Sequence, residues 1–182
     1  MGIIEDRRRE LARKEIEEVQ RNKIIAQDAE KDRQSFLAAE ECLKRSGFLP
    51  LLQLLVPPST SYKVTHDGHD SGYESGSKVY PQEPFTVGDH QNHNVGLSIF
   101  VFLGSKTVLK DGYSHTRGSN FRLKFHPDGK IVIEAGPKGS TAISVSDLSQ
   151  NPTLGEKVLE NAYLNPYVYE SKTPLVYDGA TS

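Results

Sequence analysis

Cysteine is nearly absent from this sequence, because Cys42 is the only one among 182 residues. No disulfide can form within the chain, which is typical of a protein from a reducing compartment. Cys42 lies among helix-forming residues, where a single cysteine is more often a small buried apolar side chain than a catalytic thiol. We therefore expect a cytoplasmic protein without a disulfide framework.

Long hydrophobic runs are also missing. The longest run outside the central strands covers residues 48–56, and it is interrupted by Pro50 and Gln53. A membrane-spanning helix needs about 20 apolar residues, so we expect no membrane span. The charged start of the chain, with Glu5 and Asp6 ahead of three arginines, does not have the pattern of a signal peptide. The sequence therefore predicts a soluble protein.

The chain has no excess of positive charge. Its formal net charge of −2 and its isoelectric point near 6.3 give no basic signature for nucleic acid. One cluster, Arg7–Arg9, is offset by three acidic neighbours within residues 5–10. This pattern predicts a solvated helix start rather than a phosphate site.

A block of strand patterns does occur, between residues 95 and 145. Residues 96–103 are an apolar run, which is typical of a strand buried on both faces. His-Pro-Asp-Gly at 126–129 and Gly-Pro-Lys-Gly at 136–139 are turn sequences, so consecutive strands are joined closely. The pattern predicts an antiparallel meander. We expect its strands, in chain order, over residues 96–103, 108–109, 121–125, 130–134 and 142–145.

The clearest alternation lies in residues 121–125. Phe121, Leu123 and Phe125 fall on one face of such a strand, and Arg122 and Lys124 fall on the other. A surface that binds single-stranded nucleic acid needs aromatic rings interleaved with cations on one face. This strand separates them, so we interpret it as a core strand and expect no nucleic-acid partner.

Residues 3–46 contain neither glycine nor proline and are rich in good helix formers. Gly47 follows in the position that a helix C-cap prefers. Such a helix is roughly 65 Å long, which exceeds the diameter of a domain of this size, so part of it projects or bends back. Its apolar residues form a narrow, imperfect seam for a coiled coil.

The remaining segments complete an α+β fold. Residues 48–56 predict a short helix that is apolar nearly all round, so we expect it to be buried by packing on the meander. Thr153 with Glu156 forms a capping-box pattern at the start of a C-terminal helix. The five segments that we expect are a helical arm at 1–47, the short helix at 48–56, a polar loop or linker at 57–94, the β domain with its helix at 95–165 and an extended aromatic tail at 166–182.

Four histidines fall in the predicted loop, as His66 with His69 and His90 with His93. Two such pairs have the spacing of metal ligands, with neighbouring aspartates as possible oxygen donors. Structural zinc sites usually include cysteine, however, and polar loops collect histidine and aspartate for turn formation alone. Metal binding by this loop is therefore an alternative hypothesis.

No catalytic motif is present. The sequence has no nucleophile elbow, phosphate-binding loop, dinucleotide fingerprint or metalloprotease helix. The groups nearest to chemistry lie in or beside the predicted strands, and the sequence alone does not place them in contact. They are Ser114, His115, Ser119, His126, Asp128 and Glu134.

We therefore expect a non-enzymatic interaction protein, a subunit or adaptor of a larger assembly. It would bind other subunits, or a second copy of itself, through the helical arm and the C-terminal tail. No cofactor and no catalytic residue is assigned. The alternative is a β domain that binds a metal or small ligand through the histidine-rich loop.

Overall fold

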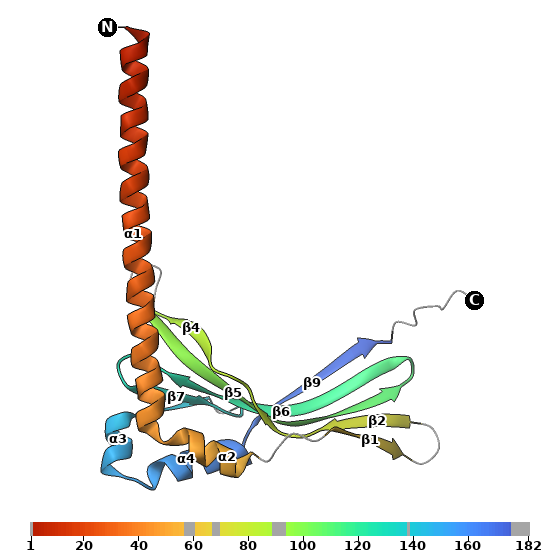
Figure 1. The fold of residues 1–182 in the computed structure, drawn as a ribbon. Coiled ribbons are helices and arrows are strands. Elements are labelled where there is room, and N and C mark those ends of the chain that lie inside the picture. The colour runs from red at the N-terminus through yellow and green to blue at the C-terminus, as the bar shows by residue number, and fades with distance from the viewer. Residues whose placement is uncertain (1, 57–60, 67–69, 89–93, 138, 176–182) are drawn as a thin grey trace, which may run out of the picture.

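The computed structural model describes residues 2–56, 61–66, 70–88, 94–137 and 139–175, with the backbone alone for residues 3, 61–66, 70 and 71. These residues form four helices and nine strands. Every strand pair is antiparallel, which confirms the predicted α+β class. Figure 1 shows the short helices gathered below one end of a long twisted sheet, and a far longer helix that projects away from it.

The long helix is α1 (Ile3–Ser46), and its 44 residues run without a break as the sequence predicts. Gly47 ends it in the left-handed conformation at φ 68°, which a residue without a Cβ adopts at little cost. Only the last turns pack against the body, where Ala39, Cys42 and Leu43 are buried. The rest of the helix projects (Figure 1).

Two long strands form the spine of the sheet. They are β5 (Asn94–Lys110) and β6 (Tyr113–Phe125), which pair from end to end except for an irregularity between Phe102 and Gly104. The sequence predicted only fragments of them, because the half of the hairpin nearest its turn lacks the apolar alternation of a half-buried strand. Gly104 sits at the irregularity with φ 117°, and a Cβ there would lie 2.8 Å from the carbonyl oxygen of Ser75.

Shorter strands border both edges of this hairpin. The edge of β5 pairs with β4 (Glu83–Val87), β3 (Lys78–Val79) and β2 (Asp70–Ser75) in turn, and β1 (Ser61–His66) pairs with β2. The edge of β6 pairs with β7 (Lys130–Glu134) and β9 (Tyr167–Pro174), and β8 (Ser140–Ser144) follows β7. Among the described residues β1 and β8 lie at opposite ends of the strand order, so the sheet is open.

The prediction of a loop or linker at 57–94 was wrong for the residues that form β1 to β4. Their side chains are mostly polar, so the period-two pattern of a half-buried strand is absent from the sequence. The long edge of β5 supplies backbone partners for β2, β3 and β4. Strand formation depends strongly on such neighbours, and the neighbour here lies outside the segment.

The hydrophobic core lies between one face of the sheet and the helices. Leu97, Ile99 and Val101 of β5 are almost completely buried on this face. The helices that cover it are the end of α1, α2 (Phe48–Leu55), α3 (Val145–Gln150) and α4 (Leu154–Leu164). Phe48 of α2 meets Phe125 of β6 edge to face, with 6.2 Å between ring centroids.

Two sequence-based details of this core were wrong. The run at 96–103 is not fully buried on both faces, since Phe100 on the opposite face is partly exposed. The short helix is not buried all round either, because Leu54 is 82% exposed. One side of each element therefore faces the core, and the other faces away from it.

The C-terminal region also differs from the prediction. Val145, predicted in a strand, is the first residue of α3, whose capping box joins Ser144 and Asp147. These hydrogen bonds hold the pKa of Asp147 below its usual value. Thr153 makes no side-chain capping bond at the start of α4. The described part of the predicted tail is β9, which lies on the protein's own sheet.

The helices cover only the half of the hairpin near β4, β7 and β8, which we call the inner half. The outer half consists of Ser105–Lys110 of β5 and Tyr113–Ser119 of β6, bordered by β1, β2 and β9. Figure 1 shows this outer half extending away from all the helices. In the part of the chain that the structure describes, both faces of the outer half are therefore open surfaces.

Replacing Phe48 by alanine tests the position of the core. Phe48 is 0% exposed, so we expect the free energy of unfolding to fall by about 3–5 kcal/mol. Leu54 of the same helix is the matched control, and Leu54→Ala should cost less than about 0.5 kcal/mol. Urea unfolding followed by circular dichroism measures both, and equal losses would contradict the described packing of α2.

Candidate functional site

The free part of α1 is the most exposed element of the molecule. From Ile4 to Lys31 every side chain except that of Glu10 is exposed, and we call these residues the arm. The arm is roughly 42 Å long at 1.5 Å per residue. Apolar side chains on it are open to solvent, and those more than half exposed are Ile4, Leu11, Ile16, Val19, Ile24 and Ile25.

Three of these apolar residues share one side of the helix. Ile4, Leu11 and Ile25 are separated by seven and fourteen residues, so they fall in one stripe. Phe36 continues the stripe and packs against the core. Ile16 and Ile24 lie away from it on the far side of the helix. The arm therefore presents a narrow apolar stripe that the described part of its own chain does not cover.

Charged side chains fill the rest of the arm and pair along it. Arg33 and Gln34 donate hydrogen bonds to Glu30, and together they lower the pKa of Glu30 to about 2, the bond from Arg33 having the larger effect. Similar pairs join Arg13 with Glu17 and Lys14 with Glu10 at 3.3 and 2.9 Å. Exposed pairs at this spacing each stabilise a helix slightly, so they support a helix without a tertiary partner.

The signs of these charges are unevenly distributed. Residues 5–14 contain five basic and three acidic side chains, for a net charge of +2. Residues 15–31 contain three basic and five acidic side chains, for a net charge of −2. The tip of the arm is therefore basic, and the part closer to the sheet is acidic.

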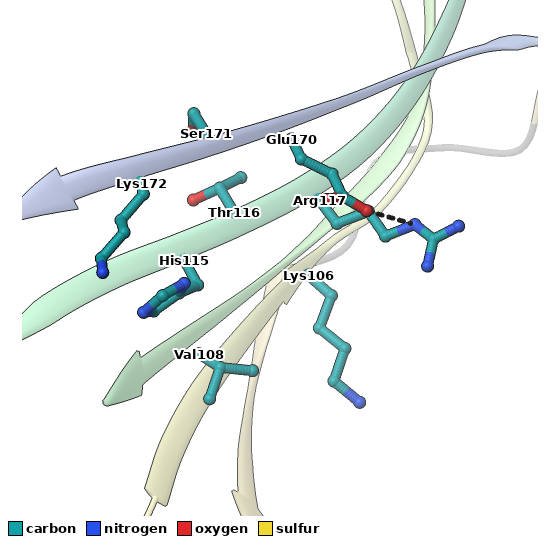
Figure 2. Close-up of a pocket in the computed structure, with 8 residues that line it drawn as sticks. All are labelled: Lys106, Val108, His115, Thr116, Arg117, Glu170, Ser171 and Lys172. Carbon is teal, nitrogen blue, oxygen red and sulfur yellow. Dashed lines mark ion pairs between the residues drawn. The ribbon is translucent and has the colours of Figure 1, made fainter. Parts of the chain in front are cut away.

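A second candidate surface lies on the outer half of the sheet. An open groove of about 480 Å³ crosses β5, β6 and β9, and Figure 2 shows the residues that line it. Lys106 and Val108 come from β5, and Lys172 comes from β9. Between them, His115 and Arg117 come from β6. This face is continuous along β6 with the face that the helices cover on the inner half.

Strand register brings basic side chains together in this groove. Lys106 is directly opposite Arg117, and His115 is directly opposite Lys172. Lys106 and Arg117 are like charges in opposed positions, which repel each other. The groove therefore concentrates positive charge on one open surface.

Two ion pairs at the surface offset part of this charge. Glu170 lies 3.5 Å from Arg117 (Figure 2), and Glu74 lies 3.6 Å from Lys106. Ion pairs in contact with solvent contribute little free energy. Lys106, Arg117 and Lys172 together with Glu74 and Glu170 therefore leave this surface with a net charge of +1.

The sequence did not single out this groove. Lys106, Arg117 and Lys172 are far apart in the chain and have no motif around them. Their juxtaposition depends on the pairing of β6 with both β5 and β9. The one available signal was that Lys106, Val108 and Lys110 stand at every second position and so share one face of a strand, although this spacing extends beyond the two-residue strand that was predicted there.

The predicted metal loop is not tested by the described residues. His69, His90 and His93 lie outside them, and of His66 the backbone alone is described, at the end of β1. Within the described part of the chain, no group of three or more histidine, cysteine, aspartate or glutamate side chains is arranged to hold a metal ion.

The serine and histidine candidates are not brought together. Ser114 and His115 are neighbours on β6, so their side chains point to opposite faces of the sheet. Ser119 is four residues farther along, which is roughly 13 Å at the rise of a strand. His126 lies at the other end of β6 against the ring of Phe85, and burial lowers its pKa.

The two acidic candidates have local structural partners. Asp128 accepts a hydrogen bond from the backbone N–H of Lys130 within the turn, at 3.0 Å. Glu134 accepts one from the Lys124 ammonium at 2.6 Å across neighbouring strands. The geometry does not direct either carboxylate toward a shared reaction centre.

Comparisons with known proteins give no relative for this chain: no family model, no curated protein and no solved structure matches it. None of the helices in the described part of the chain combines the length and the apolar character that crossing a membrane requires.

Cys42 gives a test of the core next to the arm. Its side chain is buried, and desolvation raises the pKa of its thiol to about 11. Since the thiolate is the reactive form, about one thiol in a thousand is ionised at pH 8. We expect a disulfide reagent to modify native protein very slowly, and only as fast as the chain unfolds.

The control places a thiol on the exposed arm, as Ala26→Cys in a Cys42→Ala chain, which should react at once. Labelling with and without urea, followed by absorbance, measures both rates. Rapid modification of Cys42 in native protein would show that the end of α1 is not packed as described.

Proposed function

We propose that the protein is a non-enzymatic subunit that assembles through its arm, and that the arm pairs with the arm of a second copy in antiparallel orientation. The observation that carries this proposal is the uncovered apolar stripe of Ile4, Leu11 and Ile25, each more than half exposed. A helix is marginally stable on its own and gains most of its stability in proteins from packing an apolar side against a partner. A partner that covers the stripe therefore stabilises the helix itself.

The distribution of charge supports a second copy as the partner. In antiparallel orientation, the basic tip of one arm lies against the acidic region of the other, +2 against −2 in both directions. In parallel orientation, each region faces its own sign. Charges flanking an apolar seam set partner choice and direction in helix pairs, so the antiparallel pair is favoured.

The seam supports association of limited strength. Within the same register of heptads the stripe also contains Glu18, between Leu11 and Ile25. A strong coiled coil fills both apolar positions over several heptads, and this arm does not. Pairing is therefore expected to be reversible and to depend on protein concentration, as suits a subunit that joins a larger assembly.

The C-terminal tail has a smaller part in this proposal. Its described residues form β9, where Tyr167 and Val168 are 53% and 46% exposed. Apart from its pairing with β6, β9 has no strand partner among the described residues. An unpaired strand edge is a ready template for a strand of another chain, so β9 offers a secondary contact within an assembly.

Substitution of the stripe tests the proposal. Leu11→Ser with Ile25→Ser removes apolar contacts twice in a symmetric pair, so the dissociation constant should rise at least about tenfold. Ile16→Ser with Ile24→Ser is the matched control. All four residues are 58–59% exposed, but the control pair lies on the far side. Sedimentation equilibrium against the 20.2 kDa of one chain measures the effect.

If both double variants weaken association equally, the stripe is not the contact. If the unaltered chain has the mass of one copy at every concentration, the proposed self-association is wrong.

Charge reversal tests the direction of pairing. Changing Arg7, Arg8 and Arg9 to glutamate gives residues 5–14 a net charge of −4, against −2 for residues 15–31, so an antiparallel pair should separate. Adding Glu15→Lys, Glu17→Lys and Glu18→Lys changes the second region to +4 and should restore pairing. Light scattering at low salt follows both steps, and circular dichroism checks that the arm remains helical. Failure of the second set to restore the pair would contradict antiparallel packing.

A further inference from the structure

The face of the sheet opposite the helices, which we call the back face, carries many aromatic rings. Because Leu97, Ile99 and Val101 point into the core, the alternate residues of β5 point to the back face. Register with β5 and β6 assigns residues of other segments to the same face. Its aromatic residues on the inner half and at the start of β9 are Tyr80, Phe85, Phe100, Phe102, Tyr167 and Tyr169.

Cations lie among these rings. The Arg122 guanidinium is 5.9 Å from the centre of the Phe100 ring, and the Lys124 ammonium is 5.6 Å from that of Phe85. Phe100 also meets Tyr80 edge to face at 5.4 Å. The sequence predicted that Arg122 and Lys124 lie on the face of their strand that Phe121 and Phe125 do not share, and the structure confirms this. The rings that share the cation face come from neighbouring segments, which alternation along one strand does not reveal.

Some of these rings have structural partners already. Phe85 is opposite Gly96, and Tyr169 is opposite Gly118. In both cases the ring lies over the glycine so closely that a Cβ there would clash. Such pairs shield the exposed backbone of a glycine in a strand. Phe100 and Tyr167 have no such role, and Tyr167 is 53% exposed.

A hollow of about 440 Å³ lies between these two rings. Phe100 and Tyr167 both line it, and Asn120 and Arg122 of β6 lie on its floor between them. Gly136 and Gly139 also line it, together with the side chains of Glu134, Ala135 and Ser140. This volume falls within the range of small-ligand sites, and two aromatic faces flanking a polar floor suit a flat, polar ring.

The polar groups of the hollow match a nucleobase and its phosphate. The Asn120 amide offers both a donor and an acceptor, and it makes no side-chain hydrogen bond to another described residue. Arg122 pairs with no carboxylate among the described residues, whereas Lys124 is held by Glu134 at 2.6 Å. Arg122 is therefore the cation available to a phosphate oxygen.

We propose that the back face binds single-stranded nucleic acid, with one base stacked in the hollow between Phe100 and Tyr167. Asn120 then meets the edge of that base, and Arg122 contacts the backbone phosphate. Neighbouring bases stack toward Tyr80. The Lys78 ammonium lies 5.2 Å from the centre of the Tyr80 ring and adds a cation there. Aromatic rings with interleaved cations are the recurring design of surfaces that bind single strands. This proposal is independent of the pairing of the arms.

Fluorescence anisotropy with labelled oligodeoxythymidine and oligouridine of about 12 nucleotides tests it on the full chain, since one small domain covers about that length. We expect binding at low salt. Phe100→Leu and Tyr167→Leu retain apolar side chains but remove the rings, and each should weaken affinity about tenfold. Arg122→Gln should reduce the slope of log affinity against log salt by about 0.7, the value for one phosphate contact.

Two controls separate this surface from the rest of the molecule. Tyr163→Leu removes a ring of comparable size from α4, beyond the other face of the sheet, and should leave affinity unchanged. Lys106→Gln with Arg117→Gln removes cations from the groove in Figure 2. In that background, Phe100→Leu and Tyr167→Leu should still weaken affinity about tenfold. Thermal melting of each variant checks the fold.

Three results would overturn the proposal. One is the absence of binding to either oligonucleotide at low salt. Another is binding that the two ring substitutions do not weaken while both variants remain folded. The third is binding lost in the Lys106 and Arg117 variant alone, which would place the nucleic acid on the groove instead.

Discussion

The β5–β6 hairpin is longer than the hydrophobic core that the helices can cover, and the rest of the structure depends on this mismatch. The 17 residues of β5 span roughly 56 Å. Burial by α1 to α4 is concentrated on the inner half, around Phe48, Ile99 and Phe125. Beyond the irregularity at Gly104 the same two strands continue, and none of the described helices covers them (Figure 1).

This mismatch leaves two projections from one small core. The arm extends from the covered end of the sheet, and the outer half extends from the other (Figure 1). Neither has a hydrophobic core of its own among the described residues. The arm is supported by ion pairs along the helix, and the outer half by backbone pairing and by cross-strand hydrogen bonds such as that between Thr107 and Thr116. Elements built in this way gain stability when a partner covers them.

The sequence predicted the elements whose signals are local. The helix that ends at Gly47, the turn at 126–129 and the strand at 121–125 follow from composition, turn chemistry and alternation, and the structure has all three. Strands β2, β3 and β4 were missed because they depend on the edge of β5, and β1 was missed because it depends on β2. The same limit applies to the candidate sites. The arm was visible in the sequence, whereas the groove and the back face require the register between strands.

Antiparallel pairing of two arms is tested most directly by a distance between their tips. A spin label on Gly2→Cys, in a Cys42→Ala chain, marks the tip, where a Cβ meets no other atom within 4 Å. When residues 5–14 of one arm lie against residues 15–31 of the other, residue 2 lies beside residue 30 or 31 of the partner. Two labels are then separated by roughly 42 Å along the helix axis, a distance that pulsed electron paramagnetic resonance measures. Labels side by side would indicate parallel pairing, and the absence of any interaction between labels would contradict the pairing itself.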